Sequence, residues 1–157
     1  MKKSNNANQI VRNKKAAFEF FLEQEFEAGL SLQGWEVKSL REKKIHFDES
    51  YVLIKDREAY LFGTHITPLK TVSTHITADP TRTRKLLLHK KEISKILGGI
   101  QRDGYTCVPV KLYWKNNRVK CLIALAKGKQ KFDKRATQKE RDWNREKQRT
   151  MKINLKD

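Results

Sequence analysis

The chain has 157 residues, of which 35 are Lys or Arg and 18 are Asp or Glu, so its formal net charge is +17. That length suits one domain with its own core and is short for two. A cationic surplus of this size attracts polyanions, and nucleic acid is the most common polyanion in a cell. A membrane-surface protein is the alternative, but it needs an amphipathic helix with an exposed apolar face, and the sequence shows none outside segments that resemble core.

The cellular compartment follows from what the sequence lacks. No apolar run reaches the length of a membrane span, and the first 15 residues lack the hydrophobic region of a secretory signal. A cytoplasmic protein with no membrane partner is therefore expected. Cys107 and Cys121 are expected to be reduced, because the strand register inferred below places Cys121 opposite Leu112 and away from Cys107.

The N-terminal third predicts an arm, a strand and a helix. Residues 1–12 are rich in Asn and Lys without any acid, which indicates a flexible arm whose polar character continues to Lys15. From Phe18 to Leu32 apolar residues hold most even positions, which predicts a long strand with a bend near Gln24. A short helix is expected in GWEVKSLREKK, residues 34–44.

Two hairpins are predicted. The first joins YVLI (51–54) to AYLFGTHI (59–66) through Asp56 and Arg57. The second turns at Asn116 and Asn117, which tolerate the positive φ of a tight turn. Counting outward from that turn pairs Trp114 with Val119, Leu112 with Cys121, Val110 with Ile123, and Val108 with Leu125. This register predicts one buried face and one that carries Lys111, Tyr113 and Lys120.

The segment DPTRTRKLLLHKKEI, residues 79–93, predicts the start of a long helix at Pro80 with Asp79 as its cap. The buried stripe of that helix would hold Leu86, Ile93, Ile96, Leu97 and Ile100. Cations are disfavoured in the first turns of a helix by its dipole, which makes the basic residues of this stretch a candidate site for RNA phosphates. Leu87 lies off the stripe, either as an RNA contact or as a second core contact under a loop.

About six antiparallel strands with two or three helices indicate a mainly β domain over residues 13–126, and small sheets often close into barrels. Residues 127–157 differ in character, since twelve basic residues against five acidic ones give a net charge of +7. Their few large apolar residues cannot fold this segment alone. As a helix it would align Arg141, Arg145 and Arg149 in a basic stripe that continues to Lys152 and Lys156. A solubilising tail is the alternative, but the stripe and Trp143 favour RNA phosphate.

Patterns for catalysis and metal binding are weak. His46, His65, His75 and His89 lack metal-ligand spacing with one another or with the cysteines. The scattered acids between Asp48 and Asp79 are better explained as turn and cap residues than as a nuclease metal site. No glycine-rich phosphate loop is present. The sequence therefore predicts no enzyme, no metal and no cofactor.

Three segments together resemble one known family. EFEAGLSLQGWEVKSLR (25–41), DPTRTRKLLLHK (79–90) and KGKQKFDKR (127–135), in that order and spacing, closely resemble the small protein B family, the tmRNA-binding proteins of bacterial trans-translation. The resemblance covers nearly all of the chain from Asn13 onward. It implies an OB-type antiparallel β-barrel with flanking helices, a C-terminal tail that is disordered when free, and no catalytic activity.

The resemblance also implies partners and sites. The protein would bind the tRNA-like domain of tmRNA and accompany it to stalled 70S ribosomes, with elongation factor Tu as an indirect partner through aminoacylated tmRNA. The implied tmRNA-binding residues are Asn13, Lys14, Glu27, Trp35, Lys38, Arg82, Arg84, Lys85 and Leu87. The tail would contact small-subunit rRNA at the decoding centre and become helical in the empty mRNA channel.

The tail residues assigned to the ribosome by the resemblance and by the basic stripe are Gly128, Phe132, Asp133, Lys134, Arg135, Arg141, Trp143, Arg145, Arg149 and Met151. Phe132 stands where relatives often have Tyr or His, and Phe stacks on a base but forms no hydrogen bond. A general basic barrel protein, of the ribosomal or RNA-chaperone type, is the alternative function. Unlike the adaptor, it would not prefer one folded RNA at moderate salt.

Overall fold

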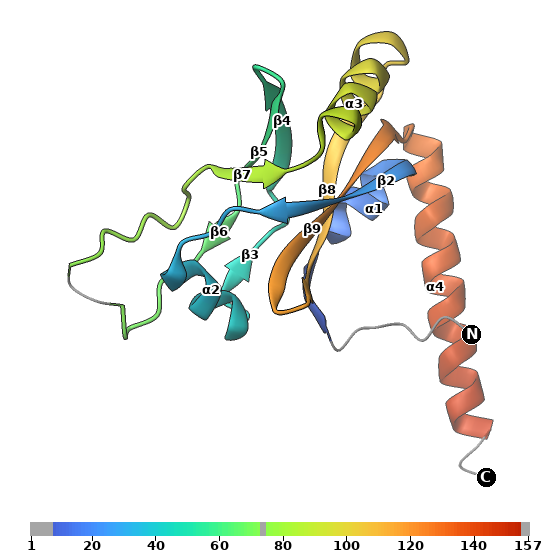
Figure 1. Ribbon diagram of the computed structural model, residues 1–157. Helices are drawn as coiled ribbons and strands as arrows, with labels where there is room; N and C mark the ends of the chain where they lie inside the picture. Colours follow the sequence, from blue (N-terminus) through green and yellow to red (C-terminus); the bar gives the residue numbers. More distant parts are fainter. Residues whose placement is uncertain (1–7, 73–74, 155–157) are drawn as a thin grey trace.

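The computed structural model describes residues 8–72 and 75–154, apart from the side chains of residues 131, 132, 153 and 154. One antiparallel sheet of seven strands dominates it, in the spatial order β1-β8-β9-β2-β7-β5-β4, and β3 pairs with β6 separately (Figure 1). The strands are β1 (Gln9–Arg12), β2 (Phe20–Leu30), β3 (Ile45–His46), β4 (Tyr51–Lys55), β5 (Glu58–Phe62), β6 (His65–Ile66), β7 (Arg84–Leu87), β8 (Thr106–Lys115) and β9 (Arg118–Gly128). The helices are α1 (Lys14–Glu19), α2 (Gly34–Arg41), α3 (Lys90–Arg102) and α4 (Lys131–Asn154).

The large sheet curls around the main hydrophobic core. β4, at one end of the strand order, lies against β8, next to the other end. Leu61, Leu112 and Ile123, from three of its strands, are completely buried in this core and supply the apolar burial that stabilises the fold. Helices α1, α2 and α3 flank the sheet, while α4 extends past it (Figure 1). The predicted mainly antiparallel β fold with flanking helices is confirmed.

The N-terminal arm is shorter than the sequence predicts. Residues 1–7 lie outside the described residues, but Gln9–Arg12 form β1, which pairs with β8. Ile10 is buried there, and Ala16 is buried in the helix that follows. The prediction of an arm through residue 12, polar up to Lys15, was therefore wrong from Gln9 onward, because two apolar side chains anchor this polar stretch to the sheet.

Strand β2 matches most of the strand predicted from Phe18 to Leu32, and α1 occupies its first two positions. The predicted bend near Gln24 is a register shift between Leu22 and Gln24 in the pairing of β2 with β9. Such a shift inserts one unpaired residue and bends the strand. The helix expected from residue 34 is α2, which ends at Arg41.

Both predicted hairpin turns are present. Asp56 and Arg57 have φ of 51° and 60° between β4 and β5, and Asn116 and Asn117 have φ of 50° and 61° between β8 and β9. Positive φ at both central residues matches the right-handed twist of the paired strands, which explains the preference of two-residue hairpins for it.

The predicted register of the final hairpin is right only near its turn. Trp114 pairs with Val119 and Leu112 with Cys121, as predicted, but the register shifts between Pro109 and Lys111. Beyond the shift Ile123 faces Pro109 and Leu125 faces Cys107, instead of the predicted valines. Proline has no N–H for the ladder, so a bulge beside it costs little. Cys107 and Cys121 are both free and buried, as expected.

The long helix predicted from Pro80 was wrong. Pro80 lies in a turn, where the Asp79 carboxylate accepts hydrogen bonds from the backbone N–H and hydroxyl of Thr81. Residues 84–87 form β7, and the helix begins only at Lys90, after the cap residue His89. Burial alternates along β7, with Arg84 and Leu86 inside and Lys85 and Leu87 outside, which is the period of a strand.

The adjacent glycines of α3 provide a test of its packing. A Cβ added at Gly99 would lie 2.8 Å from Leu125 Cδ1 of β9, whereas one at Gly98 would meet only the flexible end of Arg102. We expect Gly99→Ala to lower the free energy of unfolding by about 1–3 kcal/mol through overpacking. The matched Gly98→Ala variant should be neutral or more stable by up to about 1 kcal/mol, because Ala favours helix. Urea denaturation of both variants measures this, and equal effects would contradict it.

Candidate nucleic-acid interface

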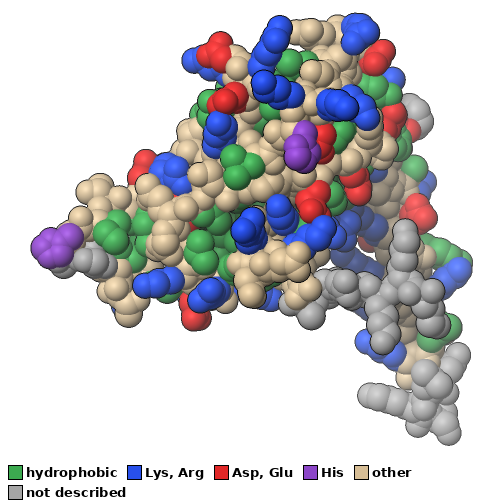
Figure 2. Space-filling view, viewed as in Figure 1, with side chains coloured by type: hydrophobic (Ala, Val, Ile, Leu, Met, Phe, Trp, Pro, Cys, Tyr) green, Lys and Arg blue, Asp and Glu red, His purple; other side chains and the backbone are tan. Residues whose placement is uncertain are grey.

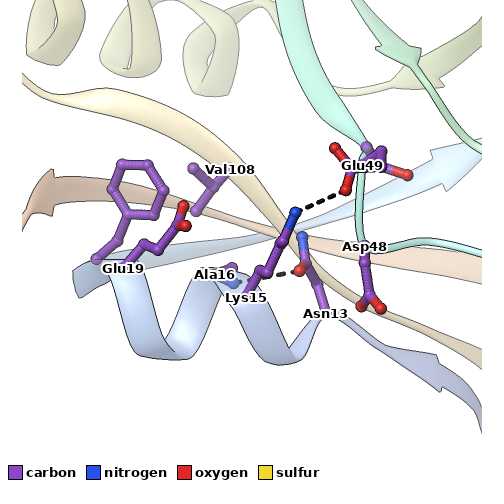
Figure 3. Close-up of a pocket in the computed structure, with 9 residues that line it drawn as sticks. Asn13, Lys15, Ala16, Glu19, Asp48, Glu49 and Val108 are labelled. Atoms are coloured by element: carbon purple, nitrogen blue, oxygen red, sulfur yellow. Dashed lines mark hydrogen bonds and ion pairs between the residues drawn. The ribbon is translucent and has the colours of Figure 1, made fainter. Parts of the chain in front are cut away.

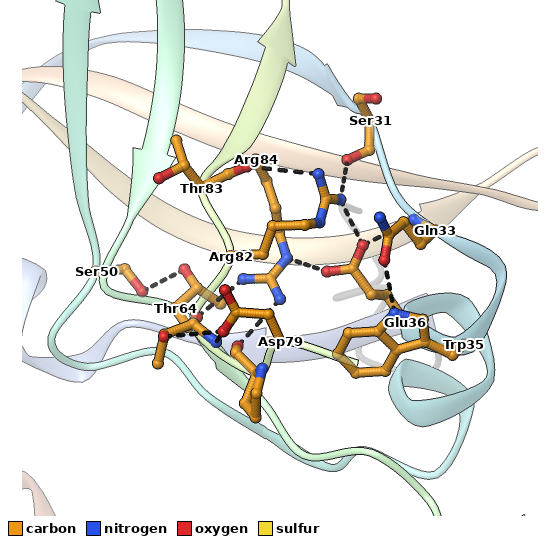
Figure 4. Close-up of polar contacts among 12 residues, drawn as sticks. Ser31, Gln33, Trp35, Glu36, Ser50, Thr64, Asp79, Arg82, Thr83 and Arg84 are labelled. Carbon is orange, nitrogen blue, oxygen red and sulfur yellow. Dashed lines mark hydrogen bonds and ion pairs between the residues drawn. The ribbon is translucent and has the colours of Figure 1, made fainter. Parts of the chain in front are cut away.

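A buried carboxylate holds α2 against β7. Arg84 donates from Nε to Glu36 Oε2, from Nη1 to the Thr64 carbonyl at 2.9 Å and from Nη2 to the Pro80 carbonyl at 3.1 Å (Figure 4). Both Arg84 and Glu36 are completely buried. Burial lowers the pKa of the Arg84 guanidinium, while the hydrogen bond to Glu36 opposes that shift. A buried ion pair survives only when its remaining donors are satisfied in this way.

The same carboxylate takes two further donors. Arg82 Nη2 lies 2.5 Å from Glu36 Oε1 and 3.2 Å from the Ser31 carbonyl. The backbone N–H of Gln33 donates to Glu36 Oε1 at 2.7 Å, which caps α2. Glu36 thereby joins the start of α2, the segment before β7 and β7 itself. Because Arg84 points inward, the alternation of a strand turns Lys85 and Leu87 to the outer face of the sheet.

That outer face carries a groove between β2, β7 and the start of α3. Its lining includes Glu27 and Gly29 from β2, Lys85 and Leu87 from β7, and Lys120 from β9. Leu87 is 53% exposed, so its alternative assignment to the core is wrong. Figure 2 shows Lys and Arg side chains spread over this side of the molecule among apolar ones. Cations beside an exposed apolar side chain suit RNA, whose phosphates and unstacked bases need both.

Gly29 allows Leu87 to lie across the sheet. Gly29 pairs with Leu87 in the register of β2 and β7, and with Lys120 in that of β2 and β9. A Cβ at position 29 would lie 3.1 Å from Leu87 Cβ and 3.4 Å from its Cδ1. The leucine thus covers the space that a side chain would fill, and Lys120 lies on the other side of the same glycine.

Glu27 is one of three acidic residues that line this groove, with Glu58 and Glu92. It accepts hydrogen bonds from the Tyr113 hydroxyl and from Lys115 Nζ, the latter at 3.0 Å. These two bonds lower the pKa of the Glu27 carboxyl, the Tyr113 bond most. The carboxylate therefore stays ionised. Because a negative group repels phosphate, Glu27 does not bind RNA phosphate itself, and its role is to orient Tyr113 and Lys115.

Asn13 has a structural role. Its Oδ1 accepts from the Ala16 N–H at 3.1 Å and its Nδ2 donates to the Pro109 carbonyl at 3.1 Å, so it caps α1 and ties it to β8. The hollow beside it is lined by Glu19, Asp48 and Glu49, and Glu49 pairs with Lys15 at 2.6 Å (Figure 3). Phosphate is disfavoured near so many carboxylates.

The expected tmRNA contacts therefore divide into two sets. Asn13, Trp35 and Arg84 are buried, and this corrects the expectation that their side chains face RNA; the Trp35 indole donates instead to Gln33 Oε1 at 2.7 Å. Six others reach the surface at least in part: Lys14, Glu27, Lys38, Arg82, Lys85 and Leu87. Glu27, Lys85 and Leu87 share the groove, while Lys38 lies beside a small apolar hollow at α2.

Lys120 and Lys115 are additions that sequence reasoning did not assign to RNA. Lys120 lines the groove, and Lys115 pairs with Glu27. The signal for Lys120 was present in the hairpin register, which places it on the face opposite the buried one. What the sequence lacks is the pairing of β9 with β2, which brings Lys120 beside Gly29 and Leu87.

The tail forms helix α4 in the structure, and its first turns are anchored on α1. Lys129 donates from its backbone N to the Glu19 carbonyl at 2.8 Å and from Nζ to Thr137 Oγ1 at 3.0 Å. The Arg141 guanidinium lies 5.6 Å from the centre of the Phe18 ring. Gly128, Asp133, Lys134 and Arg135 therefore lie at the anchored end. Phe132 belongs to α4, but its side chain lies outside the described residues.

The far part of α4 is exposed. Trp143 and Met151 are 61% and 66% exposed, and Arg145, Arg149 and Lys152 of the predicted basic stripe are exposed as well. Lys156 lies outside the described residues. The Lys147 ammonium lies 5.3 Å from the centre of the Trp143 ring. The sequence and the family resemblance predict a tail that is disordered when free and helical on the ribosome, whereas in this structure of the chain alone Lys131–Asn154 form a helix.

No helix among the described residues is long and apolar enough to span a membrane. Within the same residues, no group of three or more His, Cys, Asp or Glu side chains is arranged to hold a metal ion.

Comparison with known proteins identifies the family. The model of the SmpB protein family matches residues 10–153. The chain belongs to the SmpB family. SsrA-binding proteins of Alcanivorax borkumensis and Chromohalobacter salexigens are 64% and 62% identical to it, over 91% and 93% of this chain and 90% and 93% of theirs. The SmpB family comprises RNA-binding adaptors and not enzymes.

A solved structure supports the same assignment. A chain from "tmRNA-SmpB: a journey to the center of the bacterial ribosome" matches with a TM-score of 0.63 and 39% sequence identity, over 77% of this chain and 85% of that one. The fold is therefore that of an SmpB protein, and the expected SmpB family membership is confirmed.

Glu36 allows a test of the buried ion pair. Glu36→Gln leaves the charge of Arg84 buried without its partner, which we expect to cost about 3–5 kcal/mol of folding free energy. The matched control is Glu58→Gln, which removes an exposed carboxylate that pairs with Lys85 at 2.9 Å and should cost about 0–1 kcal/mol. Urea denaturation of both variants measures the difference. Similar losses in the two variants would contradict a special role for Glu36.

Proposed function

We propose that this chain is a tmRNA-binding adaptor of trans-translation, which binds the tRNA-like domain of tmRNA and delivers it to stalled ribosomes. The observation that carries the proposal is the grouping of Glu27, Lys85 and Leu87 in one groove of a chain that matches the SmpB family over residues 10–153. The relatives named above are SsrA-binding proteins, and their role is extended here to this chain.

The groove would hold the RNA through complementary contacts. Lys85 and Lys120 would neutralise phosphates and release their counterions, which makes binding sensitive to salt. Leu87 would lie against an unstacked part of the RNA, since folded RNA is recognised largely at loops and unpaired bases. Lys14, Lys38 and Arg82 would contact the same RNA at the edges of this surface.

The tail would act after tmRNA is bound. Gly128, Phe132, Asp133, Lys134 and Arg135 would lie at the decoding centre, near the end of α4 that is anchored on α1. The exposed residues Arg141, Trp143, Arg145, Arg149 and Met151 would lie along small-subunit rRNA in the mRNA channel. Intact mRNA occupies that channel, so the helix fits only where the message is missing.

The state of the free tail follows from its packing. Helices that lack tertiary contacts are marginal in water, and the described contacts of the tail with α1 involve Lys129 and Arg141, none of them beyond Arg141. Its outer turns would therefore lose helix in solution and regain it when rRNA phosphates neutralise the basic stripe. Elongation factor Tu would be a partner only through aminoacylated tmRNA, and the cytoplasm is the compartment where these partners meet.

The RNA face is tested with Lys85→Gln and Leu87→Ala. Both side chains are exposed, so folding stability should change little, while the affinity for a transcript of the tRNA-like domain should fall. Lys85→Gln should also reduce the salt dependence by up to about one unit of slope per lost phosphate contact, whereas Leu87→Ala should leave it unchanged. Filter binding at several salt concentrations measures affinity and slope.

Lys95→Gln is the control for these variants, because Lys95 is an exposed lysine of α3 that does not line the groove. It should bind the transcript as the unsubstituted chain does. In a general basic RNA-binding protein, Lys85→Gln, Leu87→Ala and Lys95→Gln would lower the affinity by similar amounts. Such a protein would also bind an unrelated folded RNA equally well. Either result would replace the adaptor by that alternative.

The tail is tested with a chain that ends at Gln138. This chain keeps the anchoring contact between Lys129 and Thr137 and loses the exposed stripe. We expect normal folding and nearly normal affinity for the tRNA-like domain, but little tagging of stalled nascent chains in a reconstituted translation system. The control is the full chain with Lys139→Gln, an exposed position outside the stripe. Normal tagging by the shortened chain would refute the proposed role of α4.

A further inference from the structure

The outer face of the β4–β5 hairpin is aromatic. The alternation of both strands points Tyr51 and Leu53 from β4, and Tyr60 and Phe62 from β5, to the same side, and the register pairs Tyr51 with Phe62 and Leu53 with Tyr60. The rings of Tyr51 and Phe62 are stacked, with centroids 5.4 Å apart and an interplanar angle of 10°. Tyr51 is 53% and Leu53 43% exposed. Large apolar side chains grouped on a surface in this way mark binding sites.

This aromatic face is continuous with the groove at β7. Tyr60 pairs with Lys85 in the register of β5 and β7. The Tyr60 hydroxyl donates to Glu58 Oε2 at 3.2 Å, and the same oxygen pairs with Lys85 Nζ at 2.9 Å. Leu53, Tyr60 and Lys85 thus form one row across three neighbouring strands. With strands about 4.8 Å apart, the row from Lys85 to β4 spans roughly 10 Å.

The chemistry of the row fits single-stranded RNA. A cation that attracts phosphate lies beside flat apolar rings, and base–aromatic stacking next to basic groups is the usual way in which proteins hold unpaired nucleotides. An aliphatic protein partner would need no aromatic pair and no neighbouring cation.

We propose that Tyr51 and Phe62, supported by Leu53 and Tyr60, form a stacking platform for an unpaired base of the tRNA-like RNA that Lys85 contacts. The platform extends the RNA face from the groove to the edge of the sheet, and it rests on the proposed function. Tyr51 supplies the outermost ring, Phe62 backs it from the neighbouring strand, and Glu58 fixes the orientation of Tyr60 and Lys85 between the platform and the groove.

The experiment compares Tyr51→Leu with Tyr51→Phe. Leu keeps an apolar side chain but removes the ring, whereas Phe keeps the ring. We expect Tyr51→Leu to weaken binding of a tRNA-like-domain transcript by about 5- to 100-fold, the range for one lost base stack, without change in the salt slope. Tyr51→Phe should bind within about twofold of the unsubstituted chain. Both variants should keep the unfolding midpoint, because the side chain is half exposed.

Phe21→Leu is the matched control, since Phe21 is an aromatic residue of similar exposure, 47%, on β2. This variant should bind RNA as the unsubstituted chain does. If Lys85→Gln weakens binding while Tyr51→Leu binds normally, the platform is refuted and the proposed function stands. If neither variant weakens binding, the proposed function fails as well. Dimers that dissociate in Tyr51→Leu would show that this exposed edge strand pairs with a second copy of the chain, and would also refute the platform.

Discussion

The orientation of the proposed RNA face depends on one buried ion pair. Arg84 and Glu36 are completely buried together, and this pairing fixes which side of β7 faces the core. Because side chains alternate along a strand, a shift of one residue would bury Lys85 and Leu87 and expose Arg84 and Leu86. Such a pair is weak evidence for stability, but here it determines orientation, and the position of the proposed RNA face follows from that orientation.

The groove also depends on strand pairings between distant parts of the sequence. Leu87 lies across Gly29 because β7 pairs with β2, and Lys120 reaches the same glycine because β9 pairs with β2 on the other side. The basic surplus of the chain as a whole gives the sign of the partner's charge. The sheet order then determines which few cations lie beside the exposed Leu87 side chain, and this position is the proposed RNA site.

Local patterns predicted the elements whose cause is local. The two hairpin turns and the bend near Gln24 follow from turn residues and alternation, and the structure has all three. The helix expected at Pro80 was wrong because the alternating pattern of β7 includes a buried arginine. An arginine is expected to be exposed, and only its bond to Glu36, 48 residues away in the sequence, explains why Arg84 is buried. The bulge at Pro109 likewise breaks a register that the apolar pattern alone extends too far. Glu27, Lys85 and Leu87 of the groove were among the predicted tmRNA contacts, whereas Lys120 and the shape of the groove were not predicted.

The resemblance to the family implies that Asn13, Trp35 and Arg84 contact tmRNA, but these three residues are buried. Their role in the structure is to hold other elements in place. Asn13 caps α1 and binds the carbonyl of Pro109, and α1 in turn receives the backbone N–H of Lys129 at the base of α4. Arg84 likewise ties α2 to β7, one of the strands that line the groove, through its bond to Glu36. Loss of these residues would weaken RNA binding or displace the tail through a change in geometry and without the loss of a direct contact. The segments that resemble the SmpB family therefore contain two kinds of residue. The exposed ones are the proposed RNA contacts, and the buried ones hold those residues in position.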